Sequence, residues 1–390
     1  MDLMDNITIT LGGDFCPSGL PQSGLLTGGL TEADVAGSLH PLFKTTDFGI
    51  VNLECPLGER GSPIAKSGSH ERASPRMIGL LKYLGVKGVA LANNHVRDFG
   101  TEGVLDVLAL CSASGIQTVG AGATLGAARQ PLIVPIKGRT VAFINVAEQE
   151  FGNATTTRAG ANPLDLIDLL QDLRQTKERA DHVILIVHGG LELVHVPSPQ
   201  SVRLLRFLAE QGVSAVVRHH SHVTQGYEIW KGVPIFYGLG NLLFDLDSRM
   251  PDGWYQGVLV TLHLSPEGSC GFELHPIRQC DGTPSVQMLE GDAKAEALRR
   301  IEVSSTLLAS EEALSKAWAT ALKPMREYYL GLLGVPFWTV RRLLIRFGLL
   351  KYFHPSIPVA MCWENLLRCD THREVLLDIL KEEHRYSQKQ

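Results

Sequence analysis

The sequence predicts a layered α/β domain followed by a helical extension. Short strand-like runs alternate with segments of helical apolar spacing from the N-terminus to about residue 280. Several of these runs end in Asp, Glu, Asn or His, as buried strands do when they deliver side chains to the loops at their carboxyl ends. The composition then shifts, and Asp292–Leu322 is rich in Ala, Leu, Glu and Lys without a strand-like run. We therefore expect one domain over residues 1–283 and a helical extension over residues 284–390.

Each expected element follows from a local pattern. The strands are short runs of apolar and β-branched residues, at Ile7–Leu11, Phe48–Leu53, Gly88–Leu91, Thr140–Val146, His182–Val187, Val213–Val217, Val233–Leu239 and Gly257–Leu264. The helices carry an apolar stripe, and some of them stop at a glycine or begin with a proline, at Ser74–Leu84, Gly103–Ser114, Pro163–Arg179 and Ser201–Glu210. In the extension, helices are expected within Asp292–Leu322 and over Met361–Glu383.

Composition excludes several classes of protein. A formal net charge of -5 over 390 residues does not favour nucleic acid as a partner. The seven cysteines include no CxxC pair, which argues against a disulfide framework or a cysteine zinc site and suits a reducing compartment. The N-terminus does not resemble a signal peptide, and no apolar run approaches the roughly 18 to 20 residues of a transmembrane segment. We therefore expect a cytoplasmic protein without a transmembrane segment.

Residue types that bind metals recur at the ends of the expected strands. They are Asp14 in GGDF, Glu54 in VNLE, Asn93, Asn94 and His95 in ANNH, His188 in VHGG, and His220 with His222 in HHSH. A lone strand-end aspartate is more often a turn or capping residue, and a single histidine is a weak signal. Together, however, carboxylate, amide and imidazole groups at equivalent places suit a pair of divalent cations that one carboxylate can bridge.

These elements also carry a family resemblance. GGDF, VNLE, ANNHVRDFG, VHGGLE, HHSHVTQGYE and IFYGLGNLLFD span about residues 7–247 and resemble the CapA-type capsule (poly-γ-glutamate) synthesis proteins, in the calcineurin-like metallophosphatase superfamily. The resemblance implies a four-layer αββα sandwich with two divalent metal ions, Mn, Zn, Fe or Mg, at the strand ends. It implies that Glu54 bridges the ions and that the other metal ligands are Asp14, Asn94, His188, His220 and His222.

The resemblance also implies roles beyond metal binding. His95 is expected to act beside the metals as an acid or oxyanion stabiliser, and Glu192 to orient His188 or bind substrate. The sequence departs from the family pattern at Cys16, where metallophosphatases often carry histidine, and at Gly189, where the family has tryptophan. Cys16 is expected to be a small buried residue rather than a soft ligand. Arg218 stands where a glycine is frequent, and we expect it to bind an anion beside the metals as a catalytic residue.

The leading hypothesis is a metal-dependent hydrolase. It would use metal-activated water on an amide bond of γ-glutamyl type or on a phosphoester, in polymer or small-molecule biosynthesis. The substrate would be a small molecule or polymer with amide, carboxylate or phosphate groups. Two alternatives stay open: an amide-forming biosynthetic enzyme, which the lack of a P-loop disfavours, and a non-catalytic assembly protein of a poly-γ-glutamate capsule synthesis system. The sequence is also compatible with a homo-oligomer.

Residues 323–353 combine aromatic and leucine side chains with arginines. A basic amphipathic helix of this kind can lie on a membrane surface. Because Gly331, Gly334 and Pro336 interrupt the stripe, we favour packing onto the main domain by Phe337, Trp338, Leu343, Leu344 and Phe347. A dimer contact or a lid over the metals is a further alternative.

Overall fold

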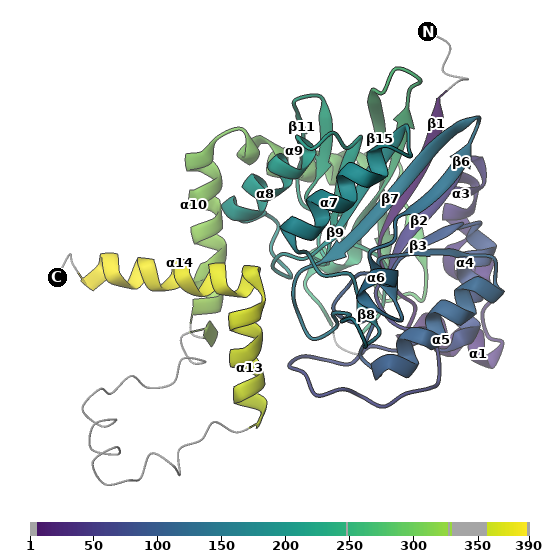
Figure 1. The fold of residues 1–390 in the computed structure, drawn as a ribbon, viewed down its shortest axis with the longest axis horizontal. Coiled ribbons are helices and arrows are strands. Elements are labelled where there is room, and N and C mark those ends of the chain that lie inside the picture. Colours follow the sequence, from purple (N-terminus) through teal and green to yellow (C-terminus); the bar gives the residue numbers. More distant parts are fainter. Residues whose placement is uncertain (1–5, 247–248, 327, 330–356, 388–390) are drawn as a thin grey trace.

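Two β-sheets face each other, and helices cover both outer faces. The computed structural model describes residues 6–246, 249–326, 328–329 and 357–387. Figure 1 shows the sandwich of sheets and helices, with the last helices at one side of it. The four-layer αββα architecture and the C-terminal helical extension that the sequence predicts are therefore confirmed.

The first sheet has eight strands. In spatial order, seven of them are β16 (Val286–Met288), β15 (Cys270–Gln279), β14 (Gln256–Leu264), β1 (Ile7–Cys16), β2 (Phe48–Leu53), β3 (Gly88–Ala90) and β4 (Gln117–Val119). The eighth, β13 (Asn241–Phe244), pairs with the end of β1. β1 to β4 run parallel, so their carboxyl ends meet at one edge. β16 lies beyond residue 283 and pairs with β15, so this sheet continues past that position.

The second sheet has six strands. Their order is β11 (Tyr227–Trp230), β12 (Val233–Phe236), β10 (Ala215–His219), β9 (His182–His188), β7 (Arg139–Ala147) and β6 (Leu132–Ile136). The central strands β12, β10, β9 and β7 are parallel, which again brings their carboxyl ends together. β5 (Ala121–Gly122) and β8 (Gly160–Ala161) form a separate small pair.

Three hydrophobic clusters separate the four layers. The central one lies between the sheets and includes Ile9, Ile50, Phe143, Ile184 and Val217, all at most 1% exposed. Beyond the first sheet lie α1 (Gly19–Thr27), α2 (Glu32–Ala36), α3 (His40–Thr45), α4 (Ile78–Leu84) and α5 (Gly100–Ala113). Beyond the second lie α7 (Leu166–Lys177) and α8 (Pro199–Ala209), while α6 (Leu125–Ala128) packs on β5 and β8. Short 3-10 turns occur at Gly37–Leu39, Pro75–Met77, Asp252–Tyr255 and Lys323–Met325.

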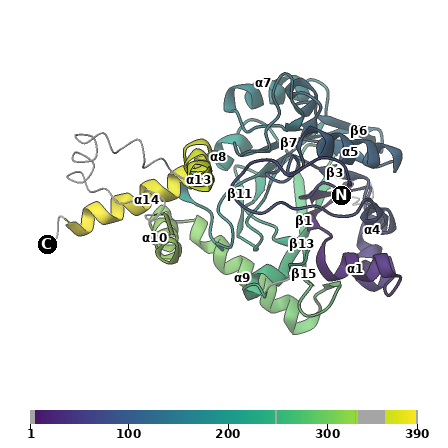
Figure 2. The same cartoon turned by 90° about the horizontal axis from the view of Figure 1, so that it is seen from below.

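The extension contains α9 (Gly291–Leu308), α10 (Glu311–Leu322), α13 (Ile357–Arg368) and α14 (Asp370–Ser387). α9 packs on β11 and β15, and α10 packs on α8 and α14 (Figure 2). The segment that we expected to pack on the main domain, with Phe337, Trp338, Leu343, Leu344 and Phe347, lies outside the described residues. Among the helices that the structure describes, none combines the length and the hydrophobicity needed to cross a bilayer.

Two of the boundaries that differ from the predicted ones have a clear physical reason. β1 continues through Gly12 and Gly13 to Cys16 instead of ending at Leu11. A Cβ on Gly13 would lie 1.9 Å from the Gly240 carbonyl oxygen, so glycine allows this close approach, and Asp14 thereby becomes part of the strand. α7 begins at Leu166 rather than Pro163, because the Asp165 side chain accepts hydrogen bonds from the first backbone N–H groups of the helix.

Candidate metal centre

All of the predicted metal ligands meet between the carboxyl ends of the parallel strands. Asp14 lies in β1, Glu54 follows β2, and Asn94 follows β3. His188 is the last residue of β9, and the remaining ligands come directly after β10 at His220 and His222. Because the two sheets face each other, the strand ends of both sheets deliver side chains to the same place. The turn after β10 has positive φ angles, 91° at His220 and 55° at His222, a costly conformation that aims both rings at one centre.

Glu54 is at the middle of this group and is 0% exposed. Its Oε1 lies 3.5 Å from His188 Nε2, 3.6 Å from His222 Nε2 and 4.0 Å from His220 Nδ1. Neither carboxylate oxygen has a hydrogen-bond partner among the described residues. Burial, and next the charge of Asp14, raise the pKa of Glu54 well above its ordinary value. An unpaired buried carboxylate is costly, so this position calls for a cation.

The donor set around Glu54 fits a divalent metal ion. Glu54, His220 and His222 can each offer a ligand atom, and these atoms all lie within 4.8 Å of one another. Carboxylate oxygen and imidazole nitrogen are the ligands that Zn, Mn and Fe prefer. Burial, followed by the charge of His220, lowers the pKa of His188 well below its ordinary value, and burial lowers that of His220 to about 4. Both imidazoles are therefore neutral at neutral pH, which is the form that binds metals.

The residues around Glu54 fall into two groups. On one side, Asp14 Oδ2 lies 3.5 Å from His222 Nδ1, which is also 2.9 Å from Asn241 Oδ1. On the other side, Asn94 Oδ1 lies 2.9 Å from His188 Nε2. Glu54 Oε1 lies 3.6 Å from His222 Nε2 of the first group and 3.5 Å from His188 Nε2 of the second.

Asp14 is held as an anion by its neighbours. It accepts hydrogen bonds from Asn52 Nδ2 at 2.8 Å and from the backbone N–H of His220 at 3.2 Å, and its Oδ1 lies 3.3 Å from His219 Nδ1. Burial alone would raise the pKa of Asp14, but the close approach of His219, with the charge of His222, keeps it below its ordinary value. Asn52 also approaches His188 Nδ1 at 3.3 Å, so one amide positions two expected ligands.

His95 is oriented by a carboxylate that the sequence analysis did not single out. Its Nδ1 lies 2.7 Å from Asp98 Oδ2, and Asp98 also forms a buried ion pair with Lys66. The engaged Nδ1 leaves Nε2 as the ring nitrogen available to a substrate. Asn93 is not part of the metal group: it caps this loop by donating to the Leu53 carbonyl at 2.8 Å and accepting from the Val96 N–H at 2.8 Å. Asp98 stands three residues after His95 in ANNHVRDFG, a spacing that could have indicated it.

A cavity of about 500 Å³ opens beside the cluster. Asn94, His95, Glu192 and His220 line it together with Lys66 and residues of the extension. Glu192 Oε1 lies 3.8 Å from His220 Nε2. Glu192 thus faces both the expected ligands and the cavity, where it can contact a substrate.

Arg218 lies within β10 and does not line this cavity. It is 3% exposed, its Nε donates to the Tyr237 carbonyl at 2.8 Å, and a terminal nitrogen donates to Gln225 Oε1 at 2.8 Å. A Cβ on Gly190 would lie 3.0 Å from its Cζ, so the guanidinium packs against the loop after β9. Arg218 is not among the described residues that line the cavity. The described hydrogen bonds of Arg218 thus go to a backbone carbonyl and a glutamine side chain, and none of them joins it to the expected metal ligands.

The other two departures from the family pattern have structural explanations. Cys16 is 0% exposed in the core beneath the first sheet, and burial, followed by its neighbour Cys55, raises the pKa of its thiol well above the ordinary value. It therefore has the environment of a small buried residue. At Gly189, a Cβ would lie 2.5 Å from Glu148 Cγ, so a tryptophan has no room there.

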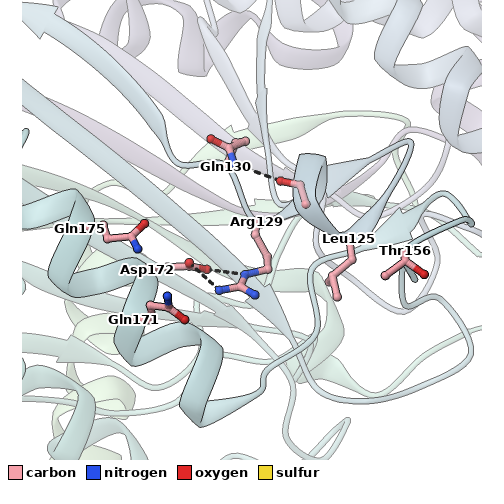
Figure 3. Close-up of a pocket in the computed structure, with 8 residues that line it drawn as sticks. Leu125, Arg129, Gln130, Thr156, Gln171, Asp172 and Gln175 are labelled. Carbon is pink, nitrogen blue, oxygen red and sulfur yellow. Dashed lines mark hydrogen bonds and ion pairs between the residues drawn. The ribbon is translucent and has the colours of Figure 1, made fainter.

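A second cavity, of about 290 Å³, lies between α6 and α7. Its prominent feature is the ion pair of Arg129 with Asp172, in which Nε and a terminal nitrogen donate at 3.0 and 2.8 Å (Figure 3). The cavity contains none of the predicted site residues.

Comparison with known proteins agrees with the resemblance. Residues 8–246 match the family model described as bacterial capsule synthesis protein PGA_cap. The PGA biosynthesis protein CapA of Bacillus subtilis is 29% identical over 268 residues, 66% of this chain and 69% of that protein. The capsule biosynthesis protein CapA of Bacillus anthracis is 27% identical over 63% of this chain and 61% of that protein. A probable polyglutamine synthesis accessory protein of Mycobacterium tuberculosis is 29% identical over 56% of this chain and 61% of that protein.

Among solved structures, a hypothetical protein from Thermus thermophilus covers 70% of this chain and all of its own, with 17% identity and a TM-score of 0.43. A 5'-nucleotidase from Candida albicans covers 83% of this chain and 59% of its own, with 10% identity and a TM-score of 0.38. The family match spans most of the chain and contains every one of the predicted metal-binding positions. This chain therefore belongs to the bacterial capsule synthesis protein family PGA_cap.

Proposed function

We propose that this protein is a metal-dependent hydrolase that cleaves an amide bond of γ-glutamyl type or a phosphoester during polymer biosynthesis. The observation that carries the proposal is Glu54, a fully buried carboxylate without a hydrogen-bond partner among the described residues, with three histidines within 4.0 Å of its Oε1. A structural carboxylate would be expected to accept hydrogen bonds from its surroundings. The printed names of the relatives support the biosynthetic context, because they refer to capsule and PGA biosynthesis.

In this proposal two divalent cations would be held by Asp14, Glu54, Asn94, His188, His220 and His222, with Glu54 as the shared ligand. Such ions, when bound, polarise a phosphoryl or acyl oxygen and lower the pKa of water. In its imidazolium form, with Nδ1–H donated to Asp98, His95 would give the Nε2 proton to the leaving group or donate it in a hydrogen bond to the developing oxyanion. Glu192 binds or orients the substrate at the cavity side of His220.

A second candidate is a non-catalytic assembly protein of a polymer-synthesis system. The name of the Mycobacterium tuberculosis relative, a probable accessory protein of polyglutamine synthesis, favours it. On this view the fold serves as a scaffold and the extension docks a partner. Amide formation is a third candidate with less support, because the sequence contains no P-loop.

Metal analysis combined with an activity panel tests the proposal. Protein purified without chelator is expected to contain metal and to hydrolyse a γ-glutamyl anilide or an aryl phosphate. Glu54→Ala should lose more metal than any other single ligand change, because a bridging residue serves both ions. Glu178→Ala, on an exposed residue at the end of α7, is the matched control and should keep both properties. Metal-free wild-type protein that is inactive on the whole panel would support the assembly role instead.

A further inference from the structure

The C-terminal extension forms one wall of the cavity beside the metal centre. Its contribution consists of Pro324, Met325, Tyr328, Tyr329, Cys362, Asn365, Leu366 and His372. All of them lie beyond residue 246, where the family match ends. The pocket that a substrate would enter is therefore shaped partly by a segment outside the matched region.

Buried polar contacts hold this wall against the main domain. Glu148, which follows β7, accepts hydrogen bonds from Thr371 Oγ1 at 2.7 Å and from Cys369 Sγ at 3.2 Å. Glu374 accepts from Ser198 Oγ at 2.6 Å, at the start of α8. Gly189 leaves the space that Glu148 occupies, directly beside the expected ligand His188. The start of α14 is thus fixed next to the metal centre.

A hydrophobic cluster joins the wall to the loop that carries Glu192. Leu191 and Val194 flank Glu192 and pack with residues of α10, α13 and α14, namely Trp318, Leu322, Leu366, Val375 and Ile379. Tyr329 belongs to the same cluster and is 3% exposed. The loop and the extension contribute to the same hydrophobic cluster. This shared packing holds the cavity-lining side chains of the extension in fixed positions.

Within this wall, His372 is oriented by Tyr329. The tyrosine hydroxyl lies 2.7 Å from His372 Nδ1. This contact fits a hydroxyl that donates to the unprotonated Nδ1. With the hydroxyl as donor, the ring proton of the neutral imidazole lies on Nε2. Burial also lowers the pKa of His372, which favours the neutral ring.

We propose that His372, oriented by Tyr329, is a specificity-determining residue that donates a hydrogen bond from Nε2 to an oxygen of the substrate in the cavity. The ligand chemistry is an oxygen acceptor, either the carbonyl or carboxylate of a glutamyl-type compound or a phosphoryl oxygen. This inference rests on the proposed function in one respect: it assumes that the substrate binds in this cavity. It adds a residue that the extension supplies and that the metal centre does not require.

Steady-state kinetics on a γ-glutamyl anilide and on an aryl phosphate test this role. His372→Ala is expected to raise KM about tenfold to a hundredfold for the preferred probe, the scale of one lost hydrogen bond, and to leave kcat and metal content within about twofold. His372→Gln keeps a side-chain N–H donor and should restore most of the affinity. Tyr329→Phe frees the ring and should raise KM to an intermediate value. His263→Gln, on β14 away from the cavity, is the matched control.

A binding measurement keeps this inference separate from the hydrolase proposal. In protein with ¹⁵N-labelled histidine, the His372 resonances should report the Nε2–H tautomer, and Tyr329→Phe should shift that equilibrium. Titration with γ-glutamylglutamate or phenyl phosphate should perturb the Nε2 signal. The probe that does so shows which kind of oxygen accepts the hydrogen bond from His372. A perturbed Nε2 without any hydrolysis would overturn only the hydrolase proposal. Folded, metal-loaded His372→Ala that binds both probes like wild type would overturn the role of His372.

Discussion

Replacing Glu54 by glutamine should stabilise the metal-free protein while it weakens metal binding. In the folded state, burial and the charge of Asp14 raise the pKa of Glu54 well above its ordinary value of 4.5. Because the pKa of Glu54 is higher in the folded than in the unfolded state, its contribution to the free energy of unfolding is fully present below pH 4.5. This contribution is lost as the pH rises toward the folded pKa. The stability of chelator-treated wild type should therefore fall with pH, and the glutamine variant should lack this component.

The size of the effect follows from linkage. Each pH unit that separates the folded from the unfolded pKa contributes about 1.4 kcal/mol. For one carboxyl group, linkage therefore sets a ceiling of about 3 kcal/mol on the growth of the stability difference between Glu54→Gln and wild type from pH 5 to pH 7. This is a large part of a typical folding free energy of about 5–15 kcal/mol.

Urea denaturation in chelator at pH 5, 6 and 7 measures this difference. Glu178→Gln, on an exposed side chain, is the control and should follow wild type at every pH. With metal present the order should reverse, because wild type gains the binding free energy of the ions and the variant does not. A pH-independent difference between Glu54→Gln and wild type would refute the argument that Glu54 is a buried, uncompensated carboxyl group.

Three further outcomes are expected. His95→Asn should keep its metal and lower turnover roughly 10²–10⁴-fold, the scale of a lost acid–base group; loss of metal in this variant would make His95 a ligand or a structural residue. Deleting residues 284–390 should give aggregated protein on size-exclusion chromatography, because the core residues Leu308 and Leu314 would be lost from the outer face of the second sheet; a soluble, fully active truncation would contradict this. Burial raises the pKa of Glu374 from its ordinary value of 4.5 to about 7. The contribution of Glu374 to the stability of the docked α14 is therefore fully present below pH 4.5, and it is lost as the pH rises through about 7. Hydrogen exchange in α14, corrected for the intrinsic rate, should accelerate between pH 6 and 8 in wild type and stay level in Glu374→Gln.

Local sequence patterns were enough to predict the layered fold and the candidate metal-binding positions. Runs such as Phe48–Leu53 and His182–Val187 have a composition typical of a buried strand, and the structure has strands there. Parallel strands bring their carboxyl ends to one edge, so polar residues at those ends had to meet. Glu54, His188 and His220 come together in this way. The family resemblance added the expected role of each of them.

Other features depend on contacts between segments that are distant in the chain. β15 was not predicted, because this partly exposed strand contains Gly271 and Pro276 and is held in the sheet by pairing with β14 and β16. The pattern of apolar residues along the chain does not predict which group the end of a long side chain contacts. Arg218, which we expected beside the metals, donates hydrogen bonds to the Tyr237 carbonyl and to Gln225.

The sequence by itself thus determined eight of the strands, most of them buried, and the candidate ligand set, because both follow from the polarity of neighbouring residues. The predicted strands correspond to β1, β2, β3, β7, β9, β10, β12 and β14. The tertiary structure decided that the extension forms a wall of the cavity beside these residues. Tyr329 and His372 are 43 positions apart, and they meet only because α14 packs against the loop that carries Glu192. That packing depends on the shape and burial of several segments at once, which local sequence patterns do not encode.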